Sequence, residues 1–286
     1  MPMSELRRDD YLLFLDHVTM QFGGLVAVDD FHNGVKPGEL LGLIGPNGAG
    51  KTTVFNVITG IYTPTKGRVY FAGIDITGLR PYIITHLGIA RTFQNIRLFQ
   101  NMTVMENVLV SQHHALTNRD ADRILKKHGM PAKRVGRFWF WKSILKSPGY
   151  NKLERRMVEE AEGLLERVGL LEVKNEKASS LPYGMQRKLE IARALATEPK
   201  LILLDEPAAG MNPQETEELM KFIVRIRDEF KVTVLLIEHD MKVVMGICER
   251  IIVLDYGKII SEGTAAEVSS DPKVIEAYLG EWENVS

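Results

Sequence analysis

The segment at residues 40–53, L-L-G-L-I-G-P-N-G-A-G-K-T-T, constrains the fold of this chain more than any other. Its first five residues are aliphatic around one glycine and indicate a short buried strand. Residues 45–52 match the pattern G-x-x-x-x-G-K-[ST] at every fixed position. The apolar residues Val54, Phe55, Val57 and Ile58 follow with helical spacing. This order predicts a strand, a phosphate-binding loop and a helix within an α/β fold.

Each residue type in this loop has a physical role beside a phosphate. Glycine lets backbone N–H groups approach phosphate oxygens, and the following helix presents the positive end of its dipole. Lys51 supplies charge for the β- and γ-phosphates, and Thr52 offers a hydroxyl to Mg²⁺. The residues expected to bind a nucleoside triphosphate are Gly45, Pro46, Asn47, Gly48, Ala49, Gly50, Lys51, Thr52 and Thr53. The alternative is a plain glycine-rich turn, and the loop alone does not separate a kinase, a GTPase and a transport ATPase.

Composition narrows the class of protein. The 286 residues, 45% hydrophobic and 26% charged, suit one large globular domain or one with an inserted lobe. A net charge of −1 gives no general attraction to nucleic acid, and no nucleic-acid partner is expected. The single cysteine, Cys248, excludes an internal disulfide and a cysteine-based metal cluster. No run is long enough to cross a bilayer, so at a membrane another subunit must hold the chain.

Hydrophobic patterning predicts further strands and helices. A capping-box spacing between Thr103 and Glu106 indicates the start of a helix. The predicted strands are 12–19, 27–31, 67–71, 89–94, 201–204, 232–237, 251–255 and 258–261, the last two forming a hairpin. The predicted helices are 103–112, 153–168 and 275–279.

Two adjacent carboxylates, Asp205 and Glu206, follow the aliphatic strand 201–204. The carboxyl ends of parallel strands form the edge where α/β proteins bind ligands. Asp205 therefore fits the carboxylate that holds Mg²⁺, and Glu206 fits the residue that polarises the attacking water. The alternative is a pair that caps a following helix, with Pro207 in its first turn.

Three single residues are candidates for a role at the nucleotide site, and each of them could instead have a purely structural role. Phe22 is either a ring that stacks on adenine or a core residue. Gln94 either contacts a magnesium-bound or attacking water or is a solvated loop amide. His239, at the end of the strand 232–237, either donates to a γ-phosphate or is structural. The basic and aromatic segment 117–150 fits a membrane-proximal role about as well as a surface insertion.

The segment 181–195, L-P-Y-G-M-Q-R-K-L-E-I-A-R-A-L, resembles the signature motif of ATP-binding-cassette (ABC) ATPases and the helix after it. The other motifs fall in that family's order over essentially the full chain: Phe22, 45–52, Gln94, the signature, Asp205 with Glu206, the partner-facing loop 209–212, and His239. The resemblance implies ATP and Mg²⁺ as ligands. It makes Glu206, His239 and Gln94 catalytic, places Phe22 on adenine, and gives Mg²⁺ the ligands Thr52, Gln94 and Asp205.

The signature departs from the usual Leu-Ser-Gly-Gly-Gln at Pro182, Tyr183 and Met185. Pro182 has neither a hydroxyl nor an N–H group, so it cannot donate to a γ-phosphate as the usual serine does. Gly184 and the following helix N-terminus retain backbone N–H groups, and Gly184 is expected to bind the ATP held by a second chain. Asn212 stands where the family has an aspartate in its partner-facing loop.

Within the family, residues 20–25, 91–99, 205–213, 237–241 and 277–280 look like the ATP-binding subunits of branched-chain amino-acid importers. The resemblance implies a P-loop NTPase of the α/β class with a RecA-like core, an antiparallel β subdomain and an inserted helical subdomain. Residues 1–286 would form one ABC ATPase domain. Its catalytic core and β subdomain would be 11–94 with 197–286, and its helical, signature-bearing subdomain 95–196.

The implied mechanism is an ATP-sandwiched, head-to-tail dimer of two ATPase subunits, either copies of this chain or this chain and a paralogue. Further partners would be integral membrane permease subunits and, indirectly, an extracytoplasmic solute-binding protein. The expected location is the cytoplasmic face of the cell membrane, with the residues after Gln94 and the insertion 117–150 as the docking surface. Alternatives are import of another amino acid, amide or small solute, and a soluble ABC-type switch. A GTPase would need an N-K-x-D motif, which the sequence lacks, and a kinase would not explain the signature.

Overall fold

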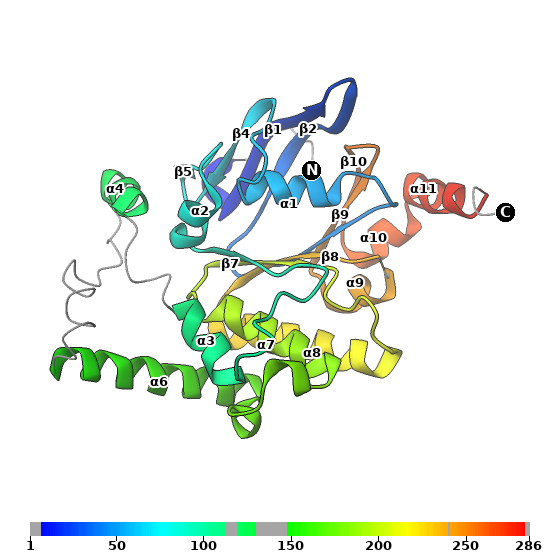
Figure 1. Ribbon diagram of the computed structural model, residues 1–286. Coiled ribbons are helices and arrows are strands. Elements are labelled where there is room, and N and C mark those ends of the chain that lie inside the picture. The colour runs from blue at the N-terminus through cyan, green and yellow to red at the C-terminus, as the bar shows by residue number, and fades with distance from the viewer. Residues whose placement is uncertain (1–6, 113–118, 130–147, 240, 284–286) are drawn as a thin grey trace. The chain divides into compact units, whose positions relative to one another are not determined.

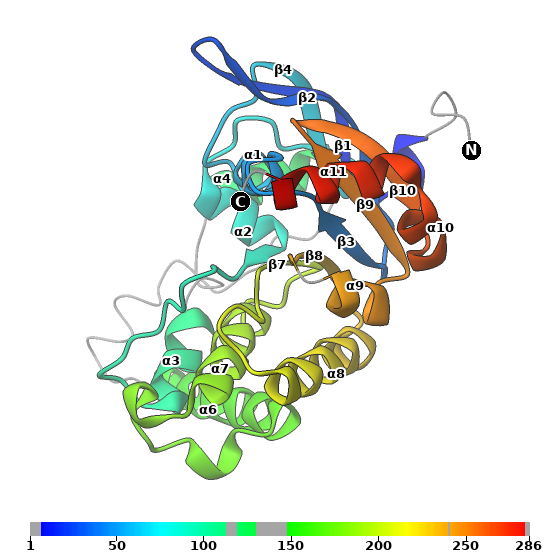
Figure 2. The same cartoon turned by 90° about the vertical axis from the view of Figure 1, so that its right-hand side faces the viewer.

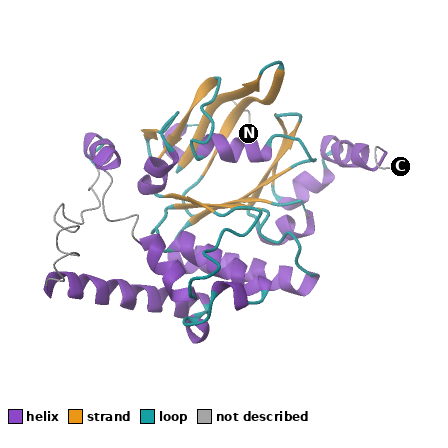
Figure 3. Cartoon of the chain, viewed as in Figure 1, coloured by secondary structure: helices purple, strands orange, loops and turns teal. Residues whose placement is uncertain are grey.

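The structure, a computed structural model, describes residues 7–112, 119–129, 148–239 and 241–283. The chain forms two compact units, one of Met1–Ile84 with Lys200–Ser286 and one of Thr85–Pro199. Most strands belong to the first unit, whereas the second is mainly helical (Figure 3). The predicted α/β class is confirmed.

The first unit is built around a sheet in which its strands follow the order β10-β9-β3-β8-β7. β3, β7, β8 and β9 are parallel, and β10 returns antiparallel to β9, which confirms the predicted hairpin. Continuous aliphatic runs explain why β3, β7 and β8 are buried along their whole length. Their bounds are β3 Leu40–Ile44, β7 Leu201–Asp205, β8 Thr233–Ile237, β9 Arg250–Asp255 and β10 Lys258–Gly263.

Helices cover both faces of this sheet. α1 (Lys51–Ile58) lies on one face, and α8 (Pro213–Phe230) and α9 (Met241–Ile247) lie on the other (Figures 1 and 2). A Cβ on Gly42 of β3 would lie 2.6 Å from Val244 Cγ1 and 3.0 Å from Cys248 Sγ. The one glycine in the predicted strand therefore lets α9 pack closely against β3.

A second sheet in this unit is antiparallel, with the order β2-β1-β4-β5. Its strands are β1 Leu13–Phe22, β2 Leu25–Val35, β4 Lys66–Phe71 and β5 Ile74–Asp75. β1 and β2 are longer than predicted, because only Gly23 and Gly24 form the turn between them. The register of their pairing shifts after Leu15 and again after Val18.

The second unit contains the packed helices α3 (Val104–Gln112), α6 (Pro148–Val168) and α7 (Tyr183–Leu195). The predicted capping box is confirmed, since Thr103 N donates to Glu106 Oε2 at 2.8 Å and Glu106 N donates to Thr103 Oγ1 at 3.1 Å. The unit also holds β6 Ile89–Arg91, α4 Arg119–Lys127 and the 3₁₀ turns Leu171–Val173 and Ala178–Ser180. Most of the basic and aromatic segment 117–150 lies outside the described residues.

The remaining helices lie at the unit boundary and near the end of the chain. α2 (Pro81–Leu87) spans the point where the first unit gives way to the second. α10 (Ala265–Ser270) and α11 (Pro272–Glu283) follow β10, and α11 contains the predicted helix 275–279. Another 3₁₀ turn, Arg8–Asp10, precedes β1.

Candidate functional site

The phosphate-binding loop between β3 and α1 has three positions whose backbone conformation favours glycine. Gly45, Gly48 and Gly50 have φ angles of 150°, 79° and 104°. A Cβ on Gly45 would lie 2.0 Å from Leu254 O, and one on Gly50 would lie 2.3 Å from Ala27 O. Glycine at these positions gives the loop a shape in which backbone N–H groups can face an anion.

Lys51 is the first residue of α1 and is 5% exposed. Its Nζ donates to the carbonyl oxygens of Gly45 at 2.6 Å and Pro46 at 2.8 Å. The ammonium is therefore curled over the loop, at the helix N-terminus. A buried positive charge beside a helix N-terminus suits a polyphosphate.

Asp205 and Glu206 stand at the carboxyl end of β7, and both are buried. Glu206 has φ 47° and its N–H donates to Ile237 O at 2.9 Å, which anchors it to the end of β8. A non-glycine residue at positive φ stores strain and often occurs at functional sites. The alternative that this pair caps a helix is wrong, since α8 begins at Pro213.

His239 follows β8 and pairs with Glu206. Its Nε2 contacts Glu206 Oε1, and because a carboxylate only accepts, the imidazole nitrogen carries the hydrogen. β8 lies between β3 and β7, and all three strands are parallel. The segments that follow these strands therefore leave the sheet at the same edge, which brings the loop after β3, Glu206 and His239 to one side.

Glu238, whose role was not predicted from the sequence, lies beside His239 and is 4% exposed. Its Oε1 accepts from Ala208 N at 2.8 Å and its Oε2 accepts from His239 N at 3.3 Å. One buried carboxylate thus fixes both the loop after Glu206 and the histidine. The available signal was a glutamate directly after an aliphatic strand.

Asn212 is the N-cap of α8. Its side chain accepts from Glu215 N at 3.0 Å, and Glu215 Oε2 accepts from Asn212 N at 3.0 Å. This capping box was not predicted, although the sequence Asn-Pro-x-Glu is its usual signature.

Phe22, the last residue of β1, is not a core residue, since it is 39% exposed. Its ring meets the Tyr62 ring edge to face, with centroids 5.1 Å apart and planes at 76°. An exposed aromatic ring with a second ring bracing it is available to stack on a planar ligand.

In the second unit, Gln94 and the signature helix are linked by the buried side chain of Arg187. Arg187 Nη2 donates to Gln94 O at 2.8 Å and to Tyr183 Oη at 3.2 Å, and Nη1 donates to Phe93 O at 2.8 Å. The Gln94 residue itself is exposed. The role of Arg187 was not predicted from the sequence, because an arginine in a helical pattern is ordinarily solvated.

Gly184 lies in the first turn of α7, whose N-cap, Pro182, makes no side-chain capping bond. A Cβ built on Gly184 meets no atom within 4 Å. The helix N-terminus is therefore sterically open at this residue.

The glycine loop, buried lysine and strand-end carboxylates define a P-loop nucleotide-binding site. A family model described as ABC transporter matches residues 28–209, and one described as branched-chain amino acid ATP-binding cassette transporter matches residues 258–281. The chain belongs to the ABC transporter family and is an ATPase subunit of that family.

Relatives cover nearly the full chain. The high-affinity branched-chain amino acid transport ATP-binding protein LivG of Escherichia coli is 45% identical, and BraF of Pseudomonas aeruginosa is 44% identical. Both alignments cover 94% of this chain and 98% of the relative.

Solved structures agree on the predicted P-loop ABC ATPase fold. The ADP conformation of the ATP-binding cassette MJ1267 has a TM-score of 0.76 at 33% identity, covering 94% of this chain and 98% of that one. A dimeric post-hydrolysis state of the cassette MJ0796, bound to ADP and Pi, has a TM-score of 0.66 at 27% identity, covering 88% and 98%. Among the described residues, no helix has the length and apolarity needed to span a membrane.

Proposed function

We propose that this chain hydrolyses ATP to drive an importer of branched-chain amino acids, namely leucine, isoleucine and valine. The pairing of Glu206 with His239, at the sheet edge that also carries the glycine loop, supports hydrolysis most directly. The likeness to LivG and BraF and the match at residues 258–281 support the substrate class.

The residues present fit a magnesium ion. Asp205 supplies a buried carboxylate and Thr52 a hydroxyl in the first turn of α1, both hard oxygen donors. The family resemblance adds Gln94 as a third ligand. Bound Mg²⁺ would neutralise charge on the β- and γ-phosphate oxygens.

The chain's own residues bind the nucleotide and activate the attacking water. Residues 45–53 hold the phosphates, with Lys51 moving from loop carbonyls to phosphate oxygens, and Phe22 stacks on adenine. Glu206 accepts a proton from the attacking water. In the structure, His239 Nε2–H contacts Glu206. When ATP is bound, this N–H donates a hydrogen bond to the γ-phosphate instead, which leaves the Glu206 carboxylate available to the attacking water.

A second ATPase subunit, the same chain or a paralogue, completes the site. We assign Gly184 and the α7 N-terminus to the γ-phosphate held by the partner, and the dimeric state of MJ0796 supports such an arrangement. Residues 11–94 with 197–286 would then be the catalytic core and β subdomain, and 95–196 the signature-bearing subdomain. Permease subunits would hold the assembly at the cytoplasmic membrane face, docked through residues after Gln94.

The variant Glu206→Gln tests hydrolysis. Removing the proton acceptor while leaving the binding residues intact is expected to abolish turnover, retain ATP and trap an ATP-dependent dimer, seen by light scattering after gel filtration. Glu217→Gln on the exposed face of α8 is the matched control and is expected to behave as wild type. A Glu206→Gln chain that binds no ATP, or that hydrolyses it normally, would overturn the assignment.

Uptake assays test the substrate. Cells in which the chain's gene is deleted are expected to lose uptake of radiolabelled leucine, isoleucine and valine, and to regain it with wild type but not with Glu206→Gln. If the deletion strain takes up branched-chain amino acids normally but no longer takes up another solute, the ATPase assignment stands and the proposed substrate is wrong.

A further inference from the structure

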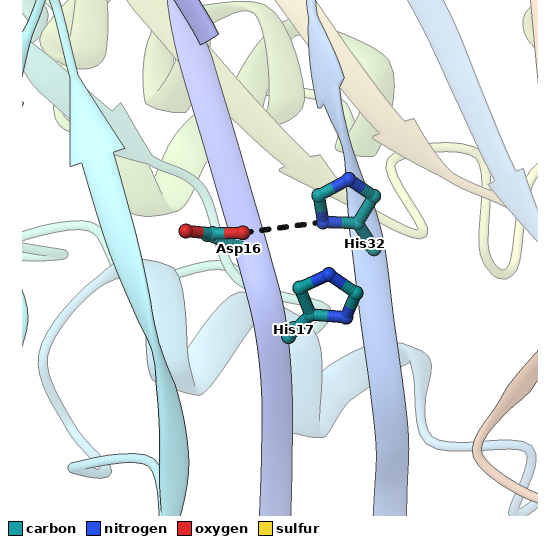
Figure 4. A group of neighbouring side chains, drawn as sticks. All are labelled: Asp16, His17 and His32. Atoms are coloured by element: carbon teal, nitrogen blue, oxygen red, sulfur yellow. Dashed lines mark ion pairs between the residues drawn. The ribbon is translucent and has the colours of Figure 1, made fainter. Parts of the chain in front are cut away.

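Asp16 and His17 of β1 and His32 of β2 form a cluster on the antiparallel sheet, and none of the three is among the residues assigned to ATP. One potential ligand atom from each lies within 4.8 Å of the others (Figure 4). We propose that these three side chains form a binding site for Zn²⁺.

The backbone explains how adjacent residues join one cluster. Successive side chains of a regular strand point to opposite faces, so Asp16 and His17 would ordinarily diverge. His17 has φ 51°, and the pairing of β1 with β2 shifts register between Leu15 and Val18. This irregularity breaks the alternation and turns His17 toward His32.

Asp30 orients the imidazole ring of His17. Its Oδ1 lies 2.7 Å from His17 Nδ1, so Nδ1 donates to the carboxylate and Nε2 keeps its lone pair for a metal. A carboxylate that fixes the tautomer of a metal-binding histidine is the usual second layer of such sites. Asp30 also has a positive φ of 54°, so two strained residues face one another here.

His32 is held from two sides. Its ring stacks on His17, with centroids 4.1 Å apart, and meets the edge of Phe14 at 5.1 Å. His32 Nδ1 lies 3.3 Å from Asp16 Oδ1, yet this buried atom makes no hydrogen bond to any part of the chain that the structure describes. A buried ring nitrogen that lies 3.3 Å from a carboxylate oxygen and makes no hydrogen bond to it suits a cation bound by both atoms.

The ligand set selects the metal. Two imidazole nitrogens and one carboxylate oxygen suit Zn²⁺, with water in the fourth position. Asp16 and Asp30 balance its charge, and Arg68, opposite Asp16 in register, pairs instead with Asp75 at 3.2 Å. Tetrahedral ligands lie about 3.4 Å apart, so the stacked rings rotate as the ion binds. The ion would then tie β1 to β2 where their register is irregular.

Zinc titration of the full chain, by calorimetry without nucleotide, tests the proposal. The expected result is one strong site per chain, a raised thermal unfolding temperature and slower amide exchange within residues 13–35. The double variant His17→Asn with His32→Gln is expected to lose the site and the thermal shift. Asparagine tolerates the positive φ at position 17, so the fold should persist.

Two controls separate this site from other histidines. His128→Gln changes an exposed histidine of the second unit, and His113→Gln with His114→Gln changes an adjacent pair outside the described residues. Both controls should keep the strong site. Zinc binding that survives in the His17/His32 variant, or that disappears in the His113/His114 variant, would overturn the proposal, as would the absence of a strong site in wild type.

Discussion

Arg187 and Glu190 form an ion pair within α7, with Nη1 2.6 Å from Oε2 and the Arg187 side chain wholly buried. Both partners also bind the loop that carries Gln94. Arg187 donates to the carbonyl oxygens of Phe93 and Gln94, and Glu190 Oε1 accepts from Phe93 N at 3.4 Å and Arg97 N at 3.2 Å. The signature helix and the Gln94 loop of one chain are therefore a single hydrogen-bonded assembly.

Arg187→Met is expected to destabilise the protein by about 3–5 kcal/mol, because it leaves Glu190 as a buried charge without its partner. Chemical denaturation measures the loss. Arg156→Met, which removes an exposed i,i+4 pair with Glu160, is the control and should change stability little. Equal losses of folding stability in the two variants would mean that the buried ion pair stabilises the protein no more than the exposed one.

Glu238→Gln tests the carboxylate that joins Ala208 to His239. One side-chain oxygen cannot replace the two that accept from Ala208 N and His239 N, so His239 loses part of its support. A lost hydrogen bond to a charged group, about 1.5 kcal/mol, predicts a roughly tenfold lower kcat for ATP hydrolysis.

The split between kcat and KM distinguishes positioning from folding in that variant. KM for ATP should change far less than kcat, because the hydrogen bonds that the change weakens are those to Ala208 N and His239 N. Glu262→Gln, which weakens the Arg250 cluster between β9 and β10, is a control for general loss of stability. A Glu238→Gln enzyme with wild-type kcat would show that His239 needs no such support.

The parts of the fold and of the site that could be predicted from the sequence are those that depend on short-range patterns. The aliphatic runs of β3, β7 and β8 and the glycine loop could be read directly, because burial on both faces and positive φ each demand particular residue types. The parts that escaped prediction depend on partners far apart in sequence. Arg187 and Phe93 are an example, since nothing local shows that an arginine is buried until its carbonyl acceptors are known.

The same limit applies to Phe22 and His239. Local spacing left each with a structural alternative, and exposure of Phe22 decided against a core role. The contact between His239 and Glu206 depends on β7 and β8 being neighbours, which sheet order fixes and sequence spacing does not.

Cys248 provides a pH-dependent prediction. Burial, reinforced by Glu249 and Glu39, raises the pKa of its thiol above the ordinary value. The unfolded chain ionises this thiol above about pH 8.5 while the folded chain does not, so folding stability should fall as pH rises beyond that point. Denaturation at pH 7.5 and 9.5 should show a larger drop for wild type than for Cys248→Ala. Rapid reaction of the native thiol with Ellman's reagent at pH 8 would contradict this.

Gly184→Ala separates stability from function at the signature. A Cβ there meets nothing within 4 Å and the residue is helical, so alanine should stabilise α7 by about 0.5–1 kcal/mol. The same Cβ would obstruct a γ-phosphate at the helix N-terminus, so ATP-dependent dimerisation of the Glu206→Gln chain should weaken when this change is added. Gly163→Ala in α6 is the matched control, because its Cβ is equally unobstructed. It should give a similar gain in stability and leave dimerisation unchanged. If both alanine variants dimerise alike, Gly184 does not contact the partner's nucleotide.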